Sequence, residues 1–451
     1  MKFKLTEVPG SIVAPQSFRA SGVFCDIKRL GTGKGSEKGK KRDLALVVSE
    51  SPATVAGMFT TNQVCAAPVK VCIERVKKGR AQAIVVNSGN ANACTGKQGM
   101  KDALEMAGFT ERALNFPRNS VLVGSTGRIG VTLPMDNVRA GIVAAAIELG
   151  STPDHAAAAA EAIMTSDTRS KQLAVEFKVG GKSVRIGGVC KGAGMIQPGM
   201  SATGQRPAAM PLHATMLCFL TTDAAVETKA LQIALKEAVA NSFNRITVDG
   251  DMSTNDTVIV LANGMAGSPK SKVRGQRPEI RDQKSPEFRM FQAALSHVCL
   301  ELAKMIVRDG EGVSRFVTVR VKGAKSLADA DAAARAVANS ALVKTSWQGG
   351  DPNWGRIIDA LGYSPATVIE EKVDIGYSAP GSGRILWSLK RGQPTKTSFK
   401  DLCVAVAPRE FDLHINLNVG NASALMYAAD LTEEYVEFNK GDVTDPSSLG
   451  G

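Results

Sequence analysis

The chain has 451 residues, enough for two sizeable cores or one large layered domain. It is 44% hydrophobic and 5% aromatic, as in an ordinary globular protein, and no stretch approaches the ~18 continuous apolar residues of a spanning helix. The N-terminal residues MKFKLTEVPG lead into no apolar run, so we expect no signal peptide, no membrane contact and a cytoplasmic location.

The formal net charge of +12 is concentrated in two segments rich in Gly, Lys and Arg. Residues 27–42 hold seven Lys or Arg and one Glu, and residues 269–284 hold six Lys or Arg and two acids. Neither segment interleaves the aromatic side chains on which single strands stack. The charge therefore indicates two solvated loops, and we expect no nucleic-acid partner.

Strand-like and helix-like patterns alternate through the first half of the chain. They predict strands at 43–50, 55–62, within 81–96 and at 121–124, and helices near 98–107, 135–149 and 155–165. The runs 173–179 and 183–190 predict a hairpin with Gly-Gly at its turn.

The second half continues this alternation. It predicts helices at 227–244, 287–307 and about 423–438, and an alanine-rich helix within 326–345. It predicts strands at 257–262, 315–323, 371–377, 384–389, 403–407 and 411–417. Several strands neighbour one another directly, which favours a mixed α/β (α+β) fold over a doubly wound parallel sheet. No repeat or low-complexity linker marks a domain boundary.

The stretch from Cys190 to Glu227 carries the strongest chemical signal. A lysine, Lys191, and a glycine-rich turn precede an Ala214-Thr215 step that runs into the strand-like MLCFLTT. If the chain is cut before Thr215, the freed α-amine has a pKa of about 7.7–8.0 and can act as base for the neighbouring hydroxyl. The stretch therefore predicts a self-cleaving enzyme with Thr215 as its nucleophile.

Three other features have both a chemical and an ordinary interpretation. In GSTGRIG, the Thr126 hydroxyl and the Gly127 N–H could stabilise an oxyanion, although a Gly-rich turn is often only a turn. Lys191 could bind a carboxylate or be an exposed turn lysine. Glu311, in the Gly-flanked RDGEG, could hold an ammonium group or be a turn acid.

A metal site is not expected. The eight cysteines form no CxxC pair, and the histidines show no ligand spacing with them or with one another. DGDMSTND, residues 249–256, lacks the calcium-loop spacing and its closing Glu, so we expect a hydrogen-bonded turn.

Taken together and in order, these motifs resemble one family, the ornithine acetyltransferase (glutamate N-acetyltransferase) family of arginine biosynthesis. The resemblance extends from about Phe18 to Thr444. It rests on VVNSGNANACTG, GSTGRIG, MTSDT, KGAGMIQP, ATMLCFLTTDA, VDGDMSTNDTVIVLANG, DGEG, LVKTSWQGGDPNWGRI and EEYVEFN. It implies an N-terminal-nucleophile-like layered sandwich of helices around mixed sheets, with a smaller C-terminal α/β lobe.

The resemblance also implies a reaction. The chain would cleave itself between Ala214 and Thr215 into an α chain, 1–214, and a β chain, 215–451, which stay associated as α2β2. A ping-pong transfer from N-acetylornithine to glutamate would pass through acetyl-Thr215. No cofactor is implied; acetyl-CoA is a second acetyl donor in part of the family, and the sequence leaves its use open.

The family's pattern also assigns residues. The oxyanion donors fall on Thr126 and Gly127. The implied substrate contacts fall on Thr165, Lys191, Thr215, Glu311, Asn439 and Thr444.

The chain departs from the family at two places near these residues. Residues 201–213 intervene before the Ala-Thr step and contain a second such pair, Ala202-Thr203, but only Thr215 continues into MLCFLTTDA. Arg128 stands where the family has an apolar residue. Two alternatives therefore remain: a related N-terminal-nucleophile amidohydrolase or aminopeptidase, and an unprocessed, non-catalytic basic binding protein.

Overall fold

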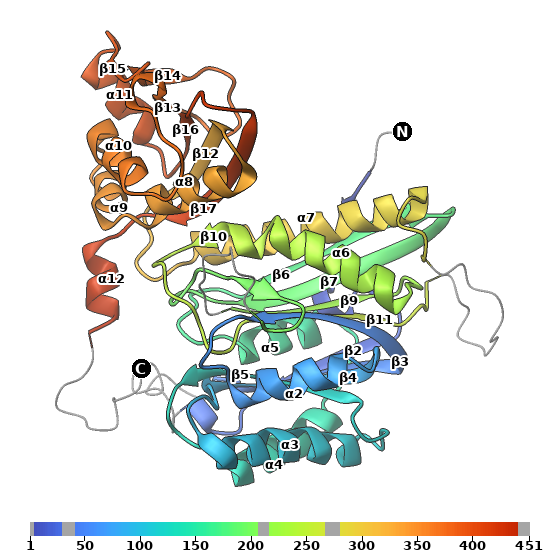
Figure 1. The fold of residues 1–451 in the computed structure, drawn as a ribbon. Helices are drawn as coiled ribbons and strands as arrows, with labels where there is room; N and C mark the ends of the chain where they lie inside the picture. Colours follow the sequence, from blue (N-terminus) through green and yellow to red (C-terminus); the bar gives the residue numbers. More distant parts are fainter. Residues whose placement is uncertain (1–3, 29–40, 206–215, 267–279, 441–451) are drawn as a thin grey trace.

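The computed structural model describes residues 4–28, 41–205, 216–266 and 280–440. Ala214, Thr215 and Thr444 lie outside these ranges, as do most of the two basic segments. The described residues form a large layered domain and a smaller C-terminal lobe (Figure 1). Both contain a mixed sheet.

The large domain is built on a ten-stranded sheet. Its strands are β1 (Thr6–Glu7), β2 (Phe18–Val23), β3 (Leu44–Thr60), β4 (Arg80–Asn90), β5 (Val121–Arg128), β6 (Lys171–Val179), β7 (Lys182–Lys191), β8 (Met200–Ser201), β9 (Leu217–Thr222) and β11 (Thr257–Ala262). The order is β1-β6-β7-β9-β11-β3-β4-β5, with β2 and β8 also paired to β3. The interval between residues 214 and 215 falls in the connection from β8 to β9.

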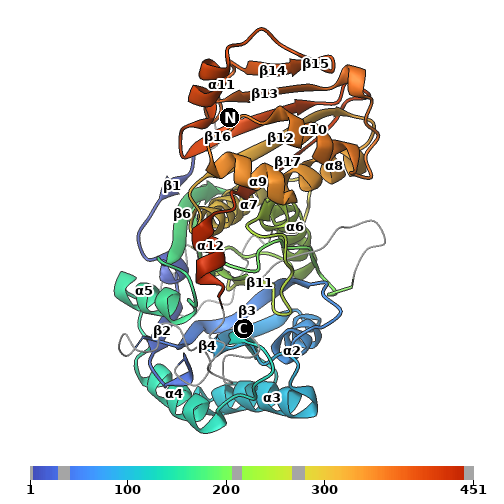
Figure 2. The same cartoon turned by 90° about the vertical axis from the view of Figure 1, so that its left-hand side faces the viewer.

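Helices cover this sheet on both sides (Figure 2). They are α2 (Ala67–Val76), α3 (Gly96–Ala113), α4 (Met135–Ile147) and α5 (Pro153–Ala162) on one side, and α6 (Thr228–Ala240) and α7 (Pro286–Arg308) on the other. In β9, Leu217 and Phe219 enter the core shared with α2–α5, whereas Cys218 and Leu220 enter the core shared with α6 and α7. A strand buried on both faces needs a continuous apolar run, as MLCFLTT provides.

Helix α7 is the one described helix that is long and apolar enough to cross a membrane by length and composition. Most of its apolar residues, among them Phe291, Leu295 and Leu302, are buried in the core with α6 and strands β6 and β7. Ser285 caps its N-terminus by accepting a hydrogen bond from the Phe288 N–H at 3.0 Å. These contacts are those of a core helix.

The C-terminal lobe has a seven-stranded sheet in the order β10-β17-β12-β16-β13-β14-β15. The strands are β10 (Ile246–Thr247), β12 (Phe316–Ala324), β13 (Asp374–Ser378), β14 (Leu386–Lys390), β15 (Gln393–Pro394), β16 (Glu410–Asn416) and β17 (Ala422–Ala429). The lobe's helices are α8 (Leu327–Asn339), α9 (Ala341–Gln348), α10 (Trp354–Gly362), α11 (Phe399–Val406) and α12 (Glu433–Phe438). Its own core centres on Trp347, Tyr377 and Phe411.

Three sequence expectations differ from the structure. The strands expected at 43–50 and 55–62 are one strand, β3, whose register shifts between Val48 and Ala53. The strand expected at 403–407 lies in α11, which Ser398 caps and which buries Leu402 and Val406, one helical turn apart. The helix expected at 423–438 is strand β17 followed by the short α12.

The expected fold class is confirmed. Helices enclose a mixed sheet in the large domain, and a separate, smaller α/β lobe follows. The β6–β7 hairpin is also confirmed, with Gly180 and Gly181 at positive φ in its turn.

Candidate functional site

The beginning of β9 is fixed by hydrogen bonds from the beginning of β11. The Met216 N–H donates to Asp256 Oδ1 at 2.5 Å, and the Thr257 N–H donates to the Met216 carbonyl at 3.1 Å. β9 and β11 are parallel, with Thr257 beside Leu217. Thr215 is bonded directly to Met216. The hydrogen bonds of Met216 therefore fix the point of the sheet to which a nucleophile at residue 215 is attached.

Lys191 lies directly across from Leu217 in the antiparallel β7–β9 pair. Its side chain is 3% exposed, so it is a buried lysine and not the exposed turn lysine that the sequence also allowed. Burial lowers the pKa of Lys191, while the charge of Asp167 opposes that effect. A buried ammonium group thus lies beside the first residue of β9.

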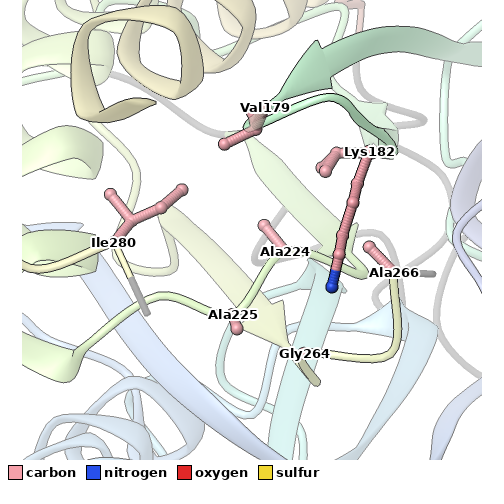
Figure 3. A pocket seen from close by; sticks show the side chains of 8 residues that line it. Val179, Lys182, Ala224, Ala225, Gly264, Ala266 and Ile280 are labelled. Atoms are coloured by element: carbon pink, nitrogen blue, oxygen red, sulfur yellow. The ribbon is translucent and has the colours of Figure 1, made fainter. Parts of the chain in front are cut away.

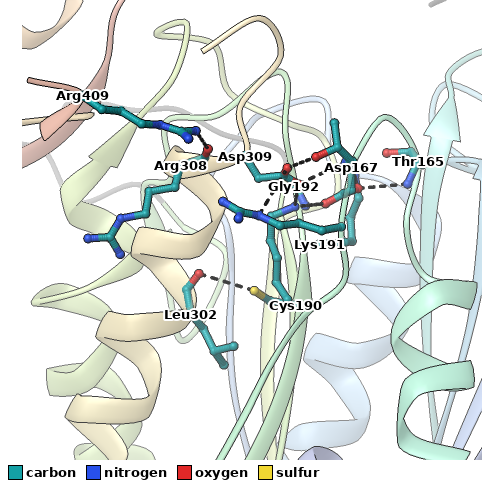
Figure 4. A network of polar contacts seen from close by, with 12 residues as sticks. Thr165, Asp167, Cys190, Lys191, Gly192, Leu302, Arg308, Asp309 and Arg409 are labelled. Atoms are coloured by element: carbon teal, nitrogen blue, oxygen red, sulfur yellow. Dashed lines mark hydrogen bonds and ion pairs between the residues drawn. The ribbon is translucent and has the colours of Figure 1, made fainter. Parts of the chain in front are cut away.

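Asp167 organises the polar network around Lys191 (Figure 4). Its Oδ1 accepts hydrogen bonds from Lys171 Nζ at 2.5 Å and from the Gly192 N–H at 2.8 Å, and its Oδ2 accepts one from the Thr165 N–H at 3.0 Å. Lys191 Nζ lies 4.0 Å from Oδ2. Burial alone would raise the pKa of Asp167, but the charges of Lys191 and Lys171 and these hydrogen bonds lower it to about 2.

Thr126 and Gly127 lie at the end of β5. The Thr126 hydroxyl is buried and has no hydrogen-bond partner among the described residues. Gly127 has φ +129°, and a Cβ there would lie 2.4 Å from the Gly89 carbonyl carbon, so only glycine fits. A buried donor without a partner, next to a strained glycine, is typical of a site that awaits a ligand atom.

Asn255 joins the end of β5 to the beginning of β9. Its Nδ2 donates to the Ser125 carbonyl at 2.8 Å and to the Ala91 carbonyl at 2.7 Å. The next residue, Asp256, holds Met216 as described above. Through these two residues the peptide before Thr126 and the peptide after Thr215 are tied to the same turn.

Glu311 approaches the same region from the turn between α7 and β12. Its N–H donates to the Ala193 carbonyl at 3.0 Å, and its carboxylate accepts a hydrogen bond from Asn439 Nδ2 at 3.0 Å. A Cβ on Gly194 would lie 2.3 Å from Glu311 Oε2, so the glycine makes room for the carboxylate. Asn439 is the residue that ends α12.

The structure therefore connects five of the predicted residues outside Thr215 itself. Lys191 and Thr165 share Asp167, Glu311 and Asn439 bond to each other beside Ala193, and Thr126 is joined through Asn255 to the turn that holds Met216. The position of Thr444 falls outside the described residues. The sequence did not single out Asp167, Asn255 and Asp256 as functional residues. The only sequence signal for them is that they are the acids and the amide within the motifs MTSDT and STNDT.

The two departures from the family can be located in part. Residues 201–205 form the end of β8 and a turn in which Thr203 and Gln205 are exposed and the Gln205 N–H donates to Thr203 Oγ1. The remainder of the interval lies outside the described residues. Arg128 is the last residue of β5 and is half-buried. The turn at 249–256 is hydrogen-bonded as expected, with Asp249 accepting from the Met195 and Ile196 N–H groups.

A hollow lies at the opposite end of β9 and β11 from Met216 (Figure 3). Its lining is apolar apart from one lysine: Val179, Lys182, Val184, Ala224, Ala225, Gly264, Ala266 and Ile280. It offers no acid, base or nucleophile beyond Lys182. Within the described ranges, no three His, Cys, Asp or Glu side chains gather in a way that could hold a metal ion.

Comparison with known proteins gives matches over nearly the whole chain. A family model described as the ArgJ family matches residues 20–442. An "Arginine biosynthesis bifunctional protein ArgJ" from Symbiobacterium thermophilum is 46% identical over 432 residues, 95% of this chain and 98% of the relative. A "Glutamate N-acetyltransferase" from Methanocaldococcus jannaschii is 42% identical over 439 residues, 96% of this chain and 98% of the relative.

Solved structures match as well. An ornithine acetyltransferase from Mycobacterium tuberculosis, complexed with ornithine, is 36% identical and covers 44% of this chain and 100% of that chain, with a TM-score of 0.39.

Proposed function

Since this chain belongs to the ArgJ family, we propose that it is an arginine-biosynthesis acetyltransferase that carries an acetyl group from N-acetylornithine to glutamate on Thr215. The observation that carries the proposal is the convergence at the beginning of β9. There, a buried lysine on β7 lies across from Leu217. Thr126, whose buried hydroxyl has no described partner, is linked through Asn255 to the turn that holds Met216. The name of one relative supplies glutamate as the acceptor, and the family resemblance implies N-acetylornithine as the acetyl donor.

The proposed maturation is self-cleavage between Ala214 and Thr215. Thr215 Oγ attacks the Ala214 carbonyl carbon, the C–N bond breaks, and water hydrolyses the resulting ester. The products are residues 1–214 and 215–451, which we propose remain associated and pair as α2β2. The freed α-amine of Thr215 then serves as base for its own hydroxyl.

In the proposed transfer, the same hydroxyl attacks the acetamide carbonyl of N-acetylornithine. Negative charge develops on the carbonyl oxygen, and the Thr126 hydroxyl and the Gly127 N–H stabilise it. Ornithine leaves, and the amine of glutamate attacks the acetyl ester in turn. The cycle needs no cofactor besides its substrates, with acetyl-CoA as a second donor to be tested.

Charged groups of both signs suit amino-acid substrates. We assign the substrate carboxylate to Lys191, whose positive charge is held in a buried position beside Asp167. We assign the substrate ammonium to Glu311, oriented by Asn439. Thr165 and Thr444 complete the proposed substrate contacts. In N-acetylornithine the acetyl group removes the charge of one of the two amines of ornithine, so the site has a single ammonium group to bind.

The test starts with the mass of the purified chain and the sequence of any new N-terminus. We expect two fragments, the second beginning at Thr215, and a single full-length chain for Thr215→Ala. Thr203→Ala is the matched control, because Thr203 also follows an alanine but lies in an exposed turn. A wild-type chain that stays at full length, or a new N-terminus at Thr203, contradicts the proposal.

Time courses with N-acetylornithine separate transfer from hydrolysis. We expect release of ornithine beyond one equivalent per enzyme to need glutamate as acceptor, with N-acetylglutamate formed in equal amount in those later turnovers. Release of ornithine and acetate at the same rate without glutamate would instead indicate an amidohydrolase.

A further inference from the structure

Asp256 is a buried acid that the proposed reaction does not yet use. It has no exposed surface and immediately precedes β11, at the point where β11 runs parallel to β9. Its Oδ1 accepts the Met216 N–H at 2.5 Å. Because the Thr257 N–H also holds the Met216 carbonyl, the peptide on either side of Met216 is fixed against the Asp256 turn.

The second carboxyl oxygen, Oδ2, is buried and has no hydrogen-bond partner among the described residues. Buried polar atoms are rarely left without one, so Oδ2 is available to a group outside those residues. Thr215 is bonded to Met216, and standard covalent dimensions keep its nitrogen and hydroxyl within about 4 Å of the Met216 nitrogen. The bond that the proposed cleavage breaks is therefore only one residue along the chain from the N–H that Asp256 holds.

The surroundings favour the protonated acid. Burial raises the pKa of Asp256 well above its usual value, and the Met216 N–H and the charge of Lys191 only partly oppose this. Lys191, on β7, is the charged group whose effect on Asp256 opposes burial. The charges of Asp167 and Glu311 favour the ammonium form of Lys191, and the charge of Lys171 opposes it. The form of Asp256 that burial stabilises is thus the one that carries a proton.

We infer that Asp256 supplies the proton that the Thr215 nitrogen needs when the Ala214–Thr215 bond breaks. The inference rests on the proposed self-cleavage. As Thr215 Oγ bonds to the Ala214 carbonyl carbon and the C–N bond breaks, Oδ2 gives its proton to the nitrogen. The carboxylate then takes the proton released by the hydroxyl, so the acid ends as it began and no other reactant is consumed.

A second buried aspartate shows what distinguishes Asp256. Asp223 follows the other end of β9, and burial raises its pKa as well. Both of its oxygens are occupied, because Oδ1 accepts the Arg185 N–H at 2.8 Å and Oδ2 accepts the Gln16 N–H at 3.0 Å. Asp223 therefore serves the fold, whereas Asp256 keeps one oxygen for chemistry.

The experiment follows cleavage of newly made chains by pulse–chase in cell-free synthesis. Asp256→Asn keeps an oxygen for the Met216 N–H but cannot pass on a proton. We expect it to fold, by far-UV circular dichroism and thermal melting, and to be cut about 100-fold or more slowly than wild type. Hydroxylamine, which cleaves esters, should not speed the cut, because formation of the ester is the step that is slowed. Asp223→Asn, the matched control, should be cut at the wild-type rate.

The outcomes separate the two proposals. A wild-type chain that is never cut removes the proposed function and this inference together. A wild-type chain that is cut, alongside Asp256→Asn cut at the same rate, overturns only the role of Asp256. If Asp256→Asn fails to fold, Asp256→Glu decides: it keeps the proton, and its cleavage should slow as the pH rises through the carboxyl pKa, whereas a pH-independent rate overturns the inference.

Discussion

Lys191 and Leu217 face each other across the antiparallel pair formed by β7 and β9. The pairing places a nearly inaccessible ammonium group beside the first residue of β9, and Asp167, 4.0 Å away, balances its charge. Asp167 is bonded in turn to Lys171 and to the Gly192 N–H. The side chains of the site thus come from different elements of the large domain. Each of them can be replaced separately by mutation.

Replacement of Lys191 by Met tests the assigned carboxylate contact. We expect the chain to stay folded, because Met has a similar length and Lys171 remains as the partner of Asp167. A charge-assisted hydrogen bond is worth about 1.5–3 kcal/mol, so kcat/KM for glutamate should fall by roughly 10- to 150-fold. Steady-state kinetics measure this, and Lys182→Met, at the exposed end of the same strand, should leave kcat/KM unchanged.

Replacement of Thr126 by Val removes the hydroxyl without changing the shape of the side chain. We expect stability to stay the same or rise, since the hydroxyl has no partner among the described residues. The kcat for acetyl transfer should fall by about 10²–10³-fold, as when one oxyanion donor is removed. Ser125→Ala should show the reverse pattern, because Ser125 Oγ bonds Asn87 Oδ1 at 2.6 Å and serves only the fold. Equal activity in Thr126→Val and wild type would exclude the oxyanion role.

Replacement of Gly127 by Ala should destabilise the large domain. The new Cβ would lie 2.4 Å from the Gly89 carbonyl carbon and 2.6 Å from the Asn90 nitrogen, and the backbone is at φ +129°. Overpacking of this kind costs about 1–3 kcal/mol, and strain at such a φ adds about 1–3 kcal/mol. Urea unfolding measures the loss. Gly130 is at φ +85° with no atom within 4 Å of an added Cβ. Gly130→Ala should therefore lower the free energy of unfolding only by the contribution from backbone strain.

The network around Asp167 predicts how stability depends on acid. The pKa of Asp167 is about 2 in the folded chain and about 3.9 for an unperturbed Asp. A lowered carboxyl pKa stabilises the fold above pH 3.9, and that contribution is lost as the pH falls from about 4 to about 2. The loss should be about 2–3 kcal/mol, seen as a falling urea midpoint.

Asp167→Asn provides the comparison for this pH dependence. It should remove that part of the acid dependence and, at neutral pH, cost about 3–5 kcal/mol, because a buried charge pair loses one partner. Asp154→Asn, at an exposed position in the first turn of α5, should leave both quantities nearly unchanged. An acid profile in Asp167→Asn identical to that of wild type would show that other carboxylates set the dependence.

The fold was predictable where local pattern and tertiary context agree. The β6–β7 hairpin has alternating residues and a Gly-Gly turn, and both signals are local. Local pattern and tertiary context disagree in β17. Its sequence ASALMYAA has high helix propensity, but the segment lies between β10 and β12 in the sheet. A propensity of a few tenths of a kcal/mol per residue does not decide the outcome there.

The site divides in the same manner. Lys191, Thr126 and Glu311 stand in recognisable Gly-rich motifs, and the sequence singled them out. Asp256 stands in a motif too, but its significance depends on Met216, forty residues earlier, and on an oxygen left without a described partner. Burial and pairing across such separations arise only when the sheet is assembled.

The position of β9 and β11 in the large sheet has a consequence for the order of events. Both strands come after residue 215, yet β9 pairs with β7 and β11 pairs with β3, which come before it. A cut before Thr215 would therefore leave two strands of the second product, β9 and β11, inserted between β7 and β3 of the first product. Two fragments that share a sheet in this way cannot exchange between molecules as ordinary subunits do. The chain must therefore fold before it is cut, and the two fragments in each enzyme molecule would always come from the same translated chain.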